Sequence, residues 1–113
     1  MFLHLGRLGM QLGRADEAIA SLRQLVAHDP KHKEGRFLLA MAHIMKNEHA
    51  AALQIANGLV SEEPTGRAFY ARALANFGLK RKAEALADIE SALRQSPDNP
   101  NLRGWQEKIR AMR

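Results

Sequence analysis

The chain has 113 residues, of which 46% are hydrophobic but only 5% aromatic, so its core must be built from aliphatic and small side chains. The absence of cysteine excludes disulfides, thiol catalysis and cysteine-ligated zinc, and no stretch reaches the roughly 18 uninterrupted apolar residues of a membrane span. The net charge of +5 comes from residues 66–113, which carry ten Lys and Arg against five Asp and Glu, whereas residues 1–65 carry seven of each sign.

Apolar residues recur at helical spacing along the chain, as in Leu22, Leu25 and Val26. Breakers divide the chain into seven expected helices, at residues 2–12, 15–28, 33–46, 49–62, 66–78, 81–95 and 100–112. Asn99 can cap the seventh helix and Pro100 suits its first turn. The pattern therefore predicts an all-α protein.

Three prolines mark an internal repeat. Pro30 and Pro64 are 34 residues apart, and Pro64 and Pro97 are 33 apart. The same two spacings relate small residues, first Gly6, Ala40 and Ala73, and then Ala18, Ala52 and Ala85. Breakers expected to turn the chain within each unit are Gly13, Asn47 and Gly78. Three units in one register predict stacked helical hairpins.

These units resemble the tetratricopeptide repeat, a helix–turn–helix unit of about 34 residues. Residues at the family's large, aliphatic, small and turn positions are Phe2, Leu5, Gly6, Gly13, Ala18, Leu22 and Pro30, then Leu39, Ala40, Ala52, Leu59 and Pro64, then Phe69, Ala73, Ala85, Ile89, Ala92 and Pro97. The resemblance implies a right-handed superhelical stack of three repeats, near residues 1–32, 33–65 and 66–98, in a single domain over 1–113. Residues 100–112 would form the capping helix, with Leu102, Trp105, Ile109 and Met112 on its apolar side.

Some positions depart from the family pattern. Gly9 and Asn76 stand where the family often has an aromatic residue, and Arg36 stands where a large apolar residue is common. We expect looser packing of these helix pairs. The first helix has no capping residue ahead of it, so we also expect the chain to be part of a longer protein.

In resembling proteins the first helix of each pair lines a concave groove that binds a peptide or a partner helix. The register assigns to this groove Leu3, Arg7 and Met10, then Phe37, Met41, Ile44 and Met45, and then Arg67, Tyr70, Leu74 and Phe77. The central helix has one polar residue, His43, between Phe37 and Met45, so its apolar stripe needs a cover beyond the protein's own core.

The preferred hypothesis is a protein-interaction scaffold whose apolar groove accepts an amphipathic helix or an extended segment of a partner, with Arg7 and Arg67 beside it for an acidic residue. The family's carboxylate clamp is mostly absent, because its positions hold Leu3, Arg7, Leu38, Arg67 and Ala71. The heat-shock-chaperone tail is therefore not expected as the ligand. In the alternative interpretation, an identical subunit in a homodimer, missing upstream sequence or ordinary packing between repeats covers the stripe.

A second alternative is nucleic-acid binding through the basic cluster Lys80, Arg81 and Lys82, which would need Tyr70, Phe77 or Trp105 exposed for base stacking. The favoured class is a non-enzyme, because no phosphate loop, nucleophile elbow or metalloprotease helix occurs. No cofactor or metal is expected: His28 and His32 are interpreted as solvated turn residues, and His43 as packed or hydrogen-bonded. Without a secretory signal, a cytoplasmic location without membrane insertion is expected.

Overall fold

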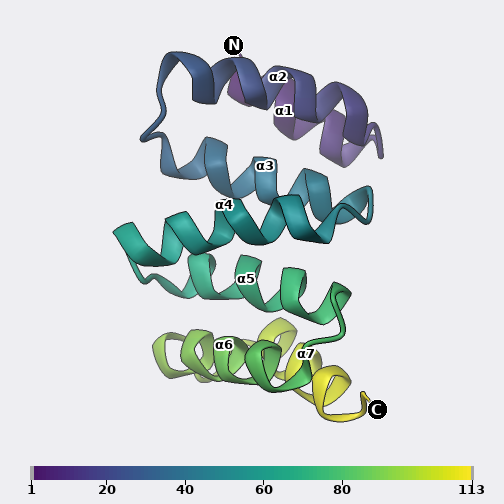
Figure 1. The fold of residues 1–113 in the computed structure, drawn as a ribbon, viewed down its shortest axis with the longest axis vertical. Helices are drawn as coiled ribbons and strands as arrows, with labels where there is room; N and C mark the ends of the chain where they lie inside the picture. The colour runs from purple at the N-terminus through teal and green to yellow at the C-terminus, as the bar shows by residue number, and fades with distance from the viewer. Residues whose placement is uncertain (1, 113) are drawn as a thin grey trace.

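The structure, a computed structural model, describes residues 2–112. Its helices in chain order are α1 (Phe2–Gln11), α2 (Ala15–His28), α3 (Lys33–Met45), α4 (His49–Glu62), α5 (Gly66–Gly78), α6 (Lys82–Gln95) and α7 (Pro100–Arg110). Three hairpins follow one another along the long axis, and α7 lies against the last of them (Figure 1). All seven predicted helices are confirmed, with ends within two residues of the predicted bounds.

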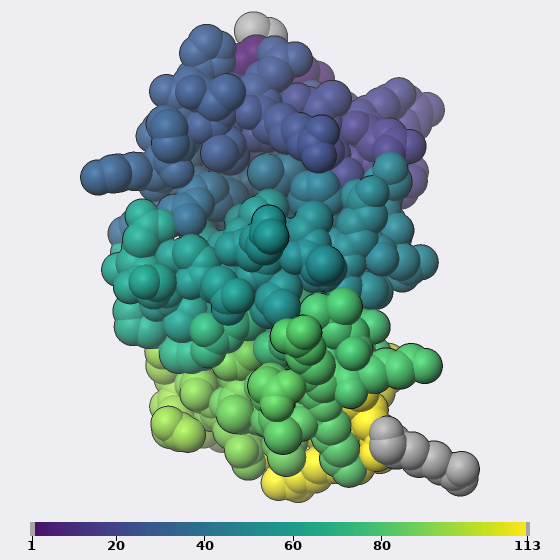
Figure 2. All heavy atoms as spheres, viewed as in Figure 1, coloured from purple at the N-terminus to yellow at the C-terminus, as the bar shows by residue number. Residues whose placement is uncertain are grey.

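The first helices of the hairpins lie on the inner side of the stack. Helix α3 contacts both α1 and α5, whereas no comparable contact joins α2 to α4 or α4 to α6 in residues 2–112. Successive hairpins form one continuous packed body from the N-terminal to the C-terminal end (Figure 2). The stack therefore curves toward α1, α3 and α5.

Side-chain caps begin the helices that open each new layer. The Nδ1 atom of His32 accepts a hydrogen bond from the Gly35 amide at 2.8 Å, and the hydroxyl of Thr65 accepts one from the Ala68 amide at 3.2 Å. The predicted cap at Asn99 is confirmed, since its side chain accepts from two amides of the first turn of α7. The interpretation of His32 as a merely solvated residue is wrong, because its ring satisfies an otherwise unpaired amide of α3.

The turns inside the hairpins share a left-handed residue at the repeat spacing. Gly13 has φ 72°, and Asn47 and Lys80 both have φ 62°. Gly78 was predicted to be the turn residue of the third hairpin. It is instead the last residue of α5 and packs against the ring of His49. Glycine is needed there for a close side-chain approach, and Lys80 adopts the strained conformation.

Small residues bring the paired helices close together. Ala40 and Ala73 are fully buried, and Gly6 lies directly beneath Leu22. The expected looser packing at Gly9 is wrong, because a Cβ built there would lie only 3.1 Å from the Ala18 backbone nitrogen. The aromatic residue of the family pattern is replaced here by direct backbone contact.

The two polar residues that depart from the family pattern, Arg36 and Asn76, are also well packed, so the looser packing expected at them is wrong. Arg36 forms an ion pair with Glu62, and its side chain is only 16% exposed. Asn76 is 4% exposed and donates a hydrogen bond from Nδ2 to Asp88 Oδ2 at 3.0 Å. Both groups have partners, so their burial leaves no unsatisfied charge or amide donor.

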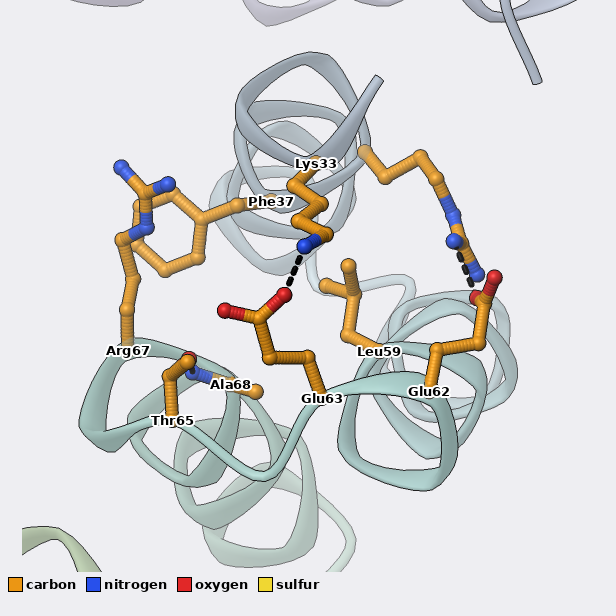
Figure 3. Close-up of a pocket in the computed structure, with 9 residues that line it drawn as sticks. Lys33, Phe37, Leu59, Glu62, Glu63, Thr65, Arg67 and Ala68 are labelled. Atoms are coloured by element: carbon orange, nitrogen blue, oxygen red, sulfur yellow. Dashed lines mark hydrogen bonds and ion pairs between the residues drawn. The ribbon is translucent and has the colours of Figure 1, made fainter. Parts of the chain in front are cut away.

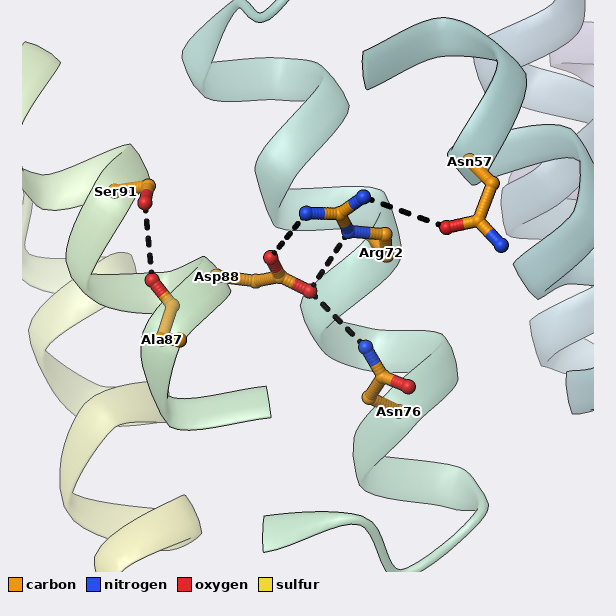
Figure 4. A network of polar contacts seen from close by, with 6 residues as sticks. All are labelled: Asn57, Arg72, Asn76, Ala87, Asp88 and Ser91. Carbon is orange, nitrogen blue, oxygen red and sulfur yellow. Dashed lines mark hydrogen bonds and ion pairs between the residues drawn. The ribbon is translucent and has the colours of Figure 1, made fainter. Parts of the chain in front are cut away.

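A buried polar network joins the second and third hairpins (Figure 4). Asp88 on α6 is 5% exposed and accepts two hydrogen bonds from Arg72 on α5, at 3.0 Å from Nε and 2.8 Å from Nη2. Arg72 also donates to Asn57 on α4 at 3.4 Å. The Asp88 carboxylate thus accepts hydrogen bonds from three donor atoms of α5, two on Arg72 and one on Asn76. Arg72 also reaches across the boundary between repeats to Asn57.

Helix α7 caps the third repeat as predicted. Leu102 and Ile109 are buried at 6% and 0% exposure, and Trp105 and Met112 are half-buried against the same cluster. The ring of Trp105 meets Phe77 edge-on, with centroids 5.3 Å apart. The helix therefore shields the apolar end of the last hairpin from water.

The α3–α4 turn gives a prediction for pH dependence. His43 is buried, and its Nδ1 lies 2.9 Å from Oε1 of Glu48; this hydrogen bond lowers the pKa of Glu48 below its ordinary value of 4.5. A carboxyl whose pKa is depressed by folding adds stability above its unfolded pKa, and the added stability disappears as the pH falls through the folded pKa. Glu48→Ala should therefore lower the Tm more at pH 7 than at about pH 3. Thermal unfolding at the two pH values checks this, and an equal loss at both would contradict it.

Candidate functional site

The predicted groove residues lie on α1, α3 and α5, the inner helices of the stack. Their exposure falls into three classes: Arg7, Met45 and Arg67 are exposed; Leu3, Met10, Phe37, Met41, Ile44, Tyr70 and Phe77 are half-buried; Leu74 is buried. The assignment of Leu74 to the groove lining is therefore wrong. At 5% exposure its side chain belongs to the interior of the stack, where a ligand could not reach it.

Helix α3 is apolar around most of its circumference because it has three apolar faces. Leu39 and Ala42 pack against α2, and Ala40 packs in the cluster that joins α3, α4 and α5. The third face carries the stripe Phe37, Met41, Ile44 and Met45. Helix α2 thus covers one face and α4 and α5 cover the second, whereas the stripe remains partly open to solvent.

Met45 is the most open part of this stripe. Its side chain is 44% exposed, and apart from Leu5, Leu8 and Leu12 in the first hairpin it is the one large hydrophobic residue in residues 2–112 with such exposure. Ile44 beside it packs partly into the cluster of Ala40, Ala52 and Ala75. The stripe is therefore anchored in the core and accessible at the C-terminal end of α3.

The two arginines beside the stripe already have partners. Arg7 on α1 forms an ion pair with Glu34 on α3. The guanidinium of Arg67 lies 5.0 Å from the centroid of the Phe37 ring, a cation–π contact that links α5 to α3 (Figure 3). Binding of an acidic ligand residue by Arg7 would thus compete with an internal carboxylate, whereas Arg67 has no ion pair in the described part of the chain.

A small pocket lies where the start of α3 meets the end of α4 and the start of α5 (Figure 3). Its rim contains the ion pair between Lys33 and Glu63 and the pair between Arg36 and Glu62. These two ion pairs join adjacent repeats across the pocket. Arg67 also lines the pocket and has no ion pair in the described residues, so the lining has one cation more than it has carboxylates.

The basic cluster lies in the α5–α6 turn. Lys80 is exposed in the left-handed conformation, and the Nζ atom of Lys82 donates to the Met112 carbonyl at 3.0 Å. The nearby aromatics Phe77 and Trp105 are half-buried and contact each other edge-on. Because the two rings contact each other, little of their ring surface is exposed for stacking with a nucleic-acid base.

Two further features bear on function, clusters of metal-ligating side chains and membrane-spanning helices. In residues 2–112 no three histidine or carboxylate side chains cluster as metal ligands would. No helix in the same range combines the length and apolar character required to cross a bilayer.

One surface was missed by the sequence-based reasoning. Leu5 and Leu8 on α1 are 43% and 41% exposed, and Leu12, which directly follows the helix, is 58% exposed, although Leu5 was assigned to an aliphatic position of the repeat. The sequence contained a signal for this surface, because the three leucines follow one another at helical spacing of three and four residues. They lie in the first hairpin, and no hairpin precedes it among the described residues.

Comparison with protein-family models agrees with the hairpin geometry. One tetratricopeptide repeat model matches residues 10–77, more than half of the chain, and a second matches residues 57–100. The chain belongs to the tetratricopeptide repeat family. The resemblance inferred from the repeat spacing is thereby confirmed, and the family's fold is a protein-interaction scaffold. Comparison with the curated proteins gave no match.

Solved tetratricopeptide repeat domains superpose closely on the chain. The first such domain of human RPAP3 is 25% identical with a TM-score of 0.90, and the match covers 96% of this chain and 87% of that one. The first domain of Spaghetti (RPAP3), bound to the HSP90 peptide SRMEEVD, is 25% identical with a TM-score of 0.89 at the same coverage. The second domain of human RPAP3, in complex with the HSP70 peptide SGPTIEEVD, has a TM-score of 0.84 at 23% identity, covering 93% of this chain and 88% of that chain.

Proposed function

We propose that this tetratricopeptide repeat chain binds an apolar or amphipathic segment of a partner protein on its inner face, with α3 as the central element. The observation that carries the proposal is the exposed Met45 at the end of a stripe that also contains Phe37 and Met41. Methionine is unbranched and polarizable, so it adapts to apolar partners of different shape. Structural relatives that bind peptides support a peptide or protein as the partner.

The ligand proposed here differs from the acidic peptides bound by those relatives. Leu3 and Leu38 replace the polar clamp residues of the family, and Ala71 is fully buried. Arg7 is paired with Glu34, which leaves Arg67 as the one clamp-like cation without a carboxylate partner in residues 2–112. A single cation beside an apolar stripe favours a mainly apolar segment with at most one acidic residue.

Charge reversal on the stripe should abolish binding. Met45→Glu should leave the fold intact because the side chain is 44% exposed, so the carboxylate can reach water. It should weaken capture of an amphipathic helical peptide at least about tenfold, since the bound peptide would desolvate the new carboxylate. Met41→Glu should do the same deeper in the stripe. Peptides selected from a displayed library against the wild type, measured by fluorescence anisotropy with circular dichroism as the folding check, provide the test.

The matched control is Gln54→Glu, which makes the same charge change at an exposed position of α4 outside the stripe. It should bind like the wild type. Binding should also persist at high salt, because an apolar contact does not depend on counterion release, whereas nucleic-acid binding would fall steeply. Full binding by Met45→Glu and Met41→Glu would reject the stripe as the site, and tight binding of SRMEEVD would replace the proposed ligand class with the acidic one.

A further inference from the structure

Helix α1 has a second apolar face that is separate from the proposed groove. Leu5, Leu8 and Leu12 lie on the side of the helix opposite Leu3 and Arg7, as the helical period requires. All three leucines are more than 40% exposed; Leu5 and Leu8 lie on α1, and Leu12 continues its last turn through a hydrogen bond from its amide to the Leu8 carbonyl. Three neighbouring exposed leucines form an apolar patch that indicates an interaction surface.

The repeat itself shows what this face does elsewhere in the chain. Leu5 and Leu8 correspond, 34 residues later, to Leu39 and Ala42 on α3, which are 7% and 0% exposed. Leu39 and Ala42 are buried in a cluster with the apolar side chains of α2, the second helix of the preceding hairpin. The leucine face of α1 therefore continues an established helix-packing interface, and in the first hairpin it has no helix of the described chain against it.

The remaining surfaces of the chain decide which occupant fits. The outer side of α7, at the other end of the stack, carries the charged residues Arg103, Glu107 and Arg110 and cannot match a leucine face. A head-to-tail filament is thus disfavoured. Among the described residues the one surface with the same leucine character is α1 of another copy.

We propose that α1 forms a two-fold homodimer interface in which its leucine face packs antiparallel against the same face of a second copy. The spacing of Leu5, Leu8 and Leu12 is the three-then-four pattern of a helix–helix seam. In the antiparallel pair Leu8 lies opposite Leu8 of the second copy, and Leu5 lies opposite Leu12. The interface is isologous, so it closes at two subunits.

Charge is compatible with this pairing. Helix α1 contains no acidic residue, and its one arginine, Arg7, lies on the opposite side in an ion pair with Glu34. The residues of α1 beside the leucine seam are His4 and Gln11, so pairing brings no lysine, arginine or carboxylate of the two α1 helices together. Because the grooves lie on the other side of α1, a dimer would present two of them and bind two linked partner segments with avidity.

Oligomeric state tests the proposal directly. Sedimentation equilibrium from about 5 to 500 µM should show the mass rise from 12.6 kDa toward twice that value, because a small apolar interface gives weak association. Leu8→Glu should keep the protein monomeric over the whole range. Gln54→Glu is the matched control, since Gln54 is also exposed but lies on α4, and it should dimerise like the wild type.

Cross-linking tests the geometry as well as the mass. The chain has no cysteine, so Leu8→Cys introduces a single thiol that the two-fold places opposite its own copy. Mild oxidation should convert Leu8→Cys to a covalent dimer much faster than Gln54→Cys, whose thiol would also be exposed but lies on α4. A wild type that stays monomeric at the highest concentration would overturn the proposal, and so would equal cross-linking of the two variants. If the wild type is monomeric but binds a helical peptide, and Leu8→Glu abolishes that binding, the leucine face belongs to a different partner. None of these outcomes depends on the groove being the peptide site.

Discussion

Replacing Asp88 by alanine should lower the free energy of unfolding by about 2–4 kcal/mol, one of the two largest effects expected in this chain. The carboxylate is buried and accepts hydrogen bonds from Arg72 and Asn76, so its removal leaves both donors without their partner. The Arg72 side chain is 27% exposed and can recover part of its hydration, which keeps the loss below that of a fully buried pair. Urea denaturation followed by circular dichroism measures the change.

Asp98 provides the control for this prediction. Its side chain is fully exposed and lies 3.8 Å from Arg103, so Asp98→Ala should change stability by less than about 0.5 kcal/mol. The double variant Arg72→Met with Asp88→Leu should be more stable than Asp88→Ala, because no buried donor of Arg72 is then left unpaired. A loss below about 0.5 kcal/mol in Asp88→Ala would contradict the role given to this network.

Truncating Ile109 to alanine should destabilise the stack by about 3 kcal/mol, because its side chain is completely buried between α7 and α6 and a cavity would remain. The loss should be accompanied by faster hydrogen exchange in α7, since that helix has its main apolar contacts there with α6. Thermal and urea unfolding measure the stability, and exchange mass spectrometry locates the change.

The same helix supplies a variant of opposite sign. A Cβ at Gly104 would meet no atom within 4 Å, so Gly104→Ala should stabilise the protein by about 0.5–1 kcal/mol through helix propensity alone. If Ile109→Ala had no effect while Gly104→Ala stabilised, α7 would be a helix that adds local order without sealing the core.

Much of the candidate site was predictable because repeats fix a helical register. Phe37, Met41 and Met45 follow from the repeat spacing alone, and they lie on one face of α3 as expected. Leu74 stands in the third repeat where Met41 stands in the second, but Leu74 is only 5% exposed, whereas Met41 is half-buried. Spacing along one helix cannot show which neighbour covers a given face.

Arg7 and Arg67 also show the difference between what the sequence predicts and what the tertiary structure decides. The sequence indicated basic residues beside the groove, but not that Glu34 neutralises Arg7 or that Arg67 lies over the ring of Phe37. These partners are 27 and 30 residues away in the chain and meet only when repeats stack. The exposed leucine face of α1 was missed for a related reason: its equivalent in α3 is core, and only the order of hairpins in space distinguishes them.

The sequence by itself determined the helices, their pairing and the family, because helical periodicity, helix-breaking residues and a 33–34-residue repeat act over short distances or recur in register. Tertiary structure alone decided which polar groups are satisfied and which apolar faces stay open. Asp88 could be known as a buried acceptor, and His32 as a helix cap, only once their neighbours were in place. Burial and hydrogen bonding depend on distances between separate helices, and those distances are set by packing rather than by local sequence.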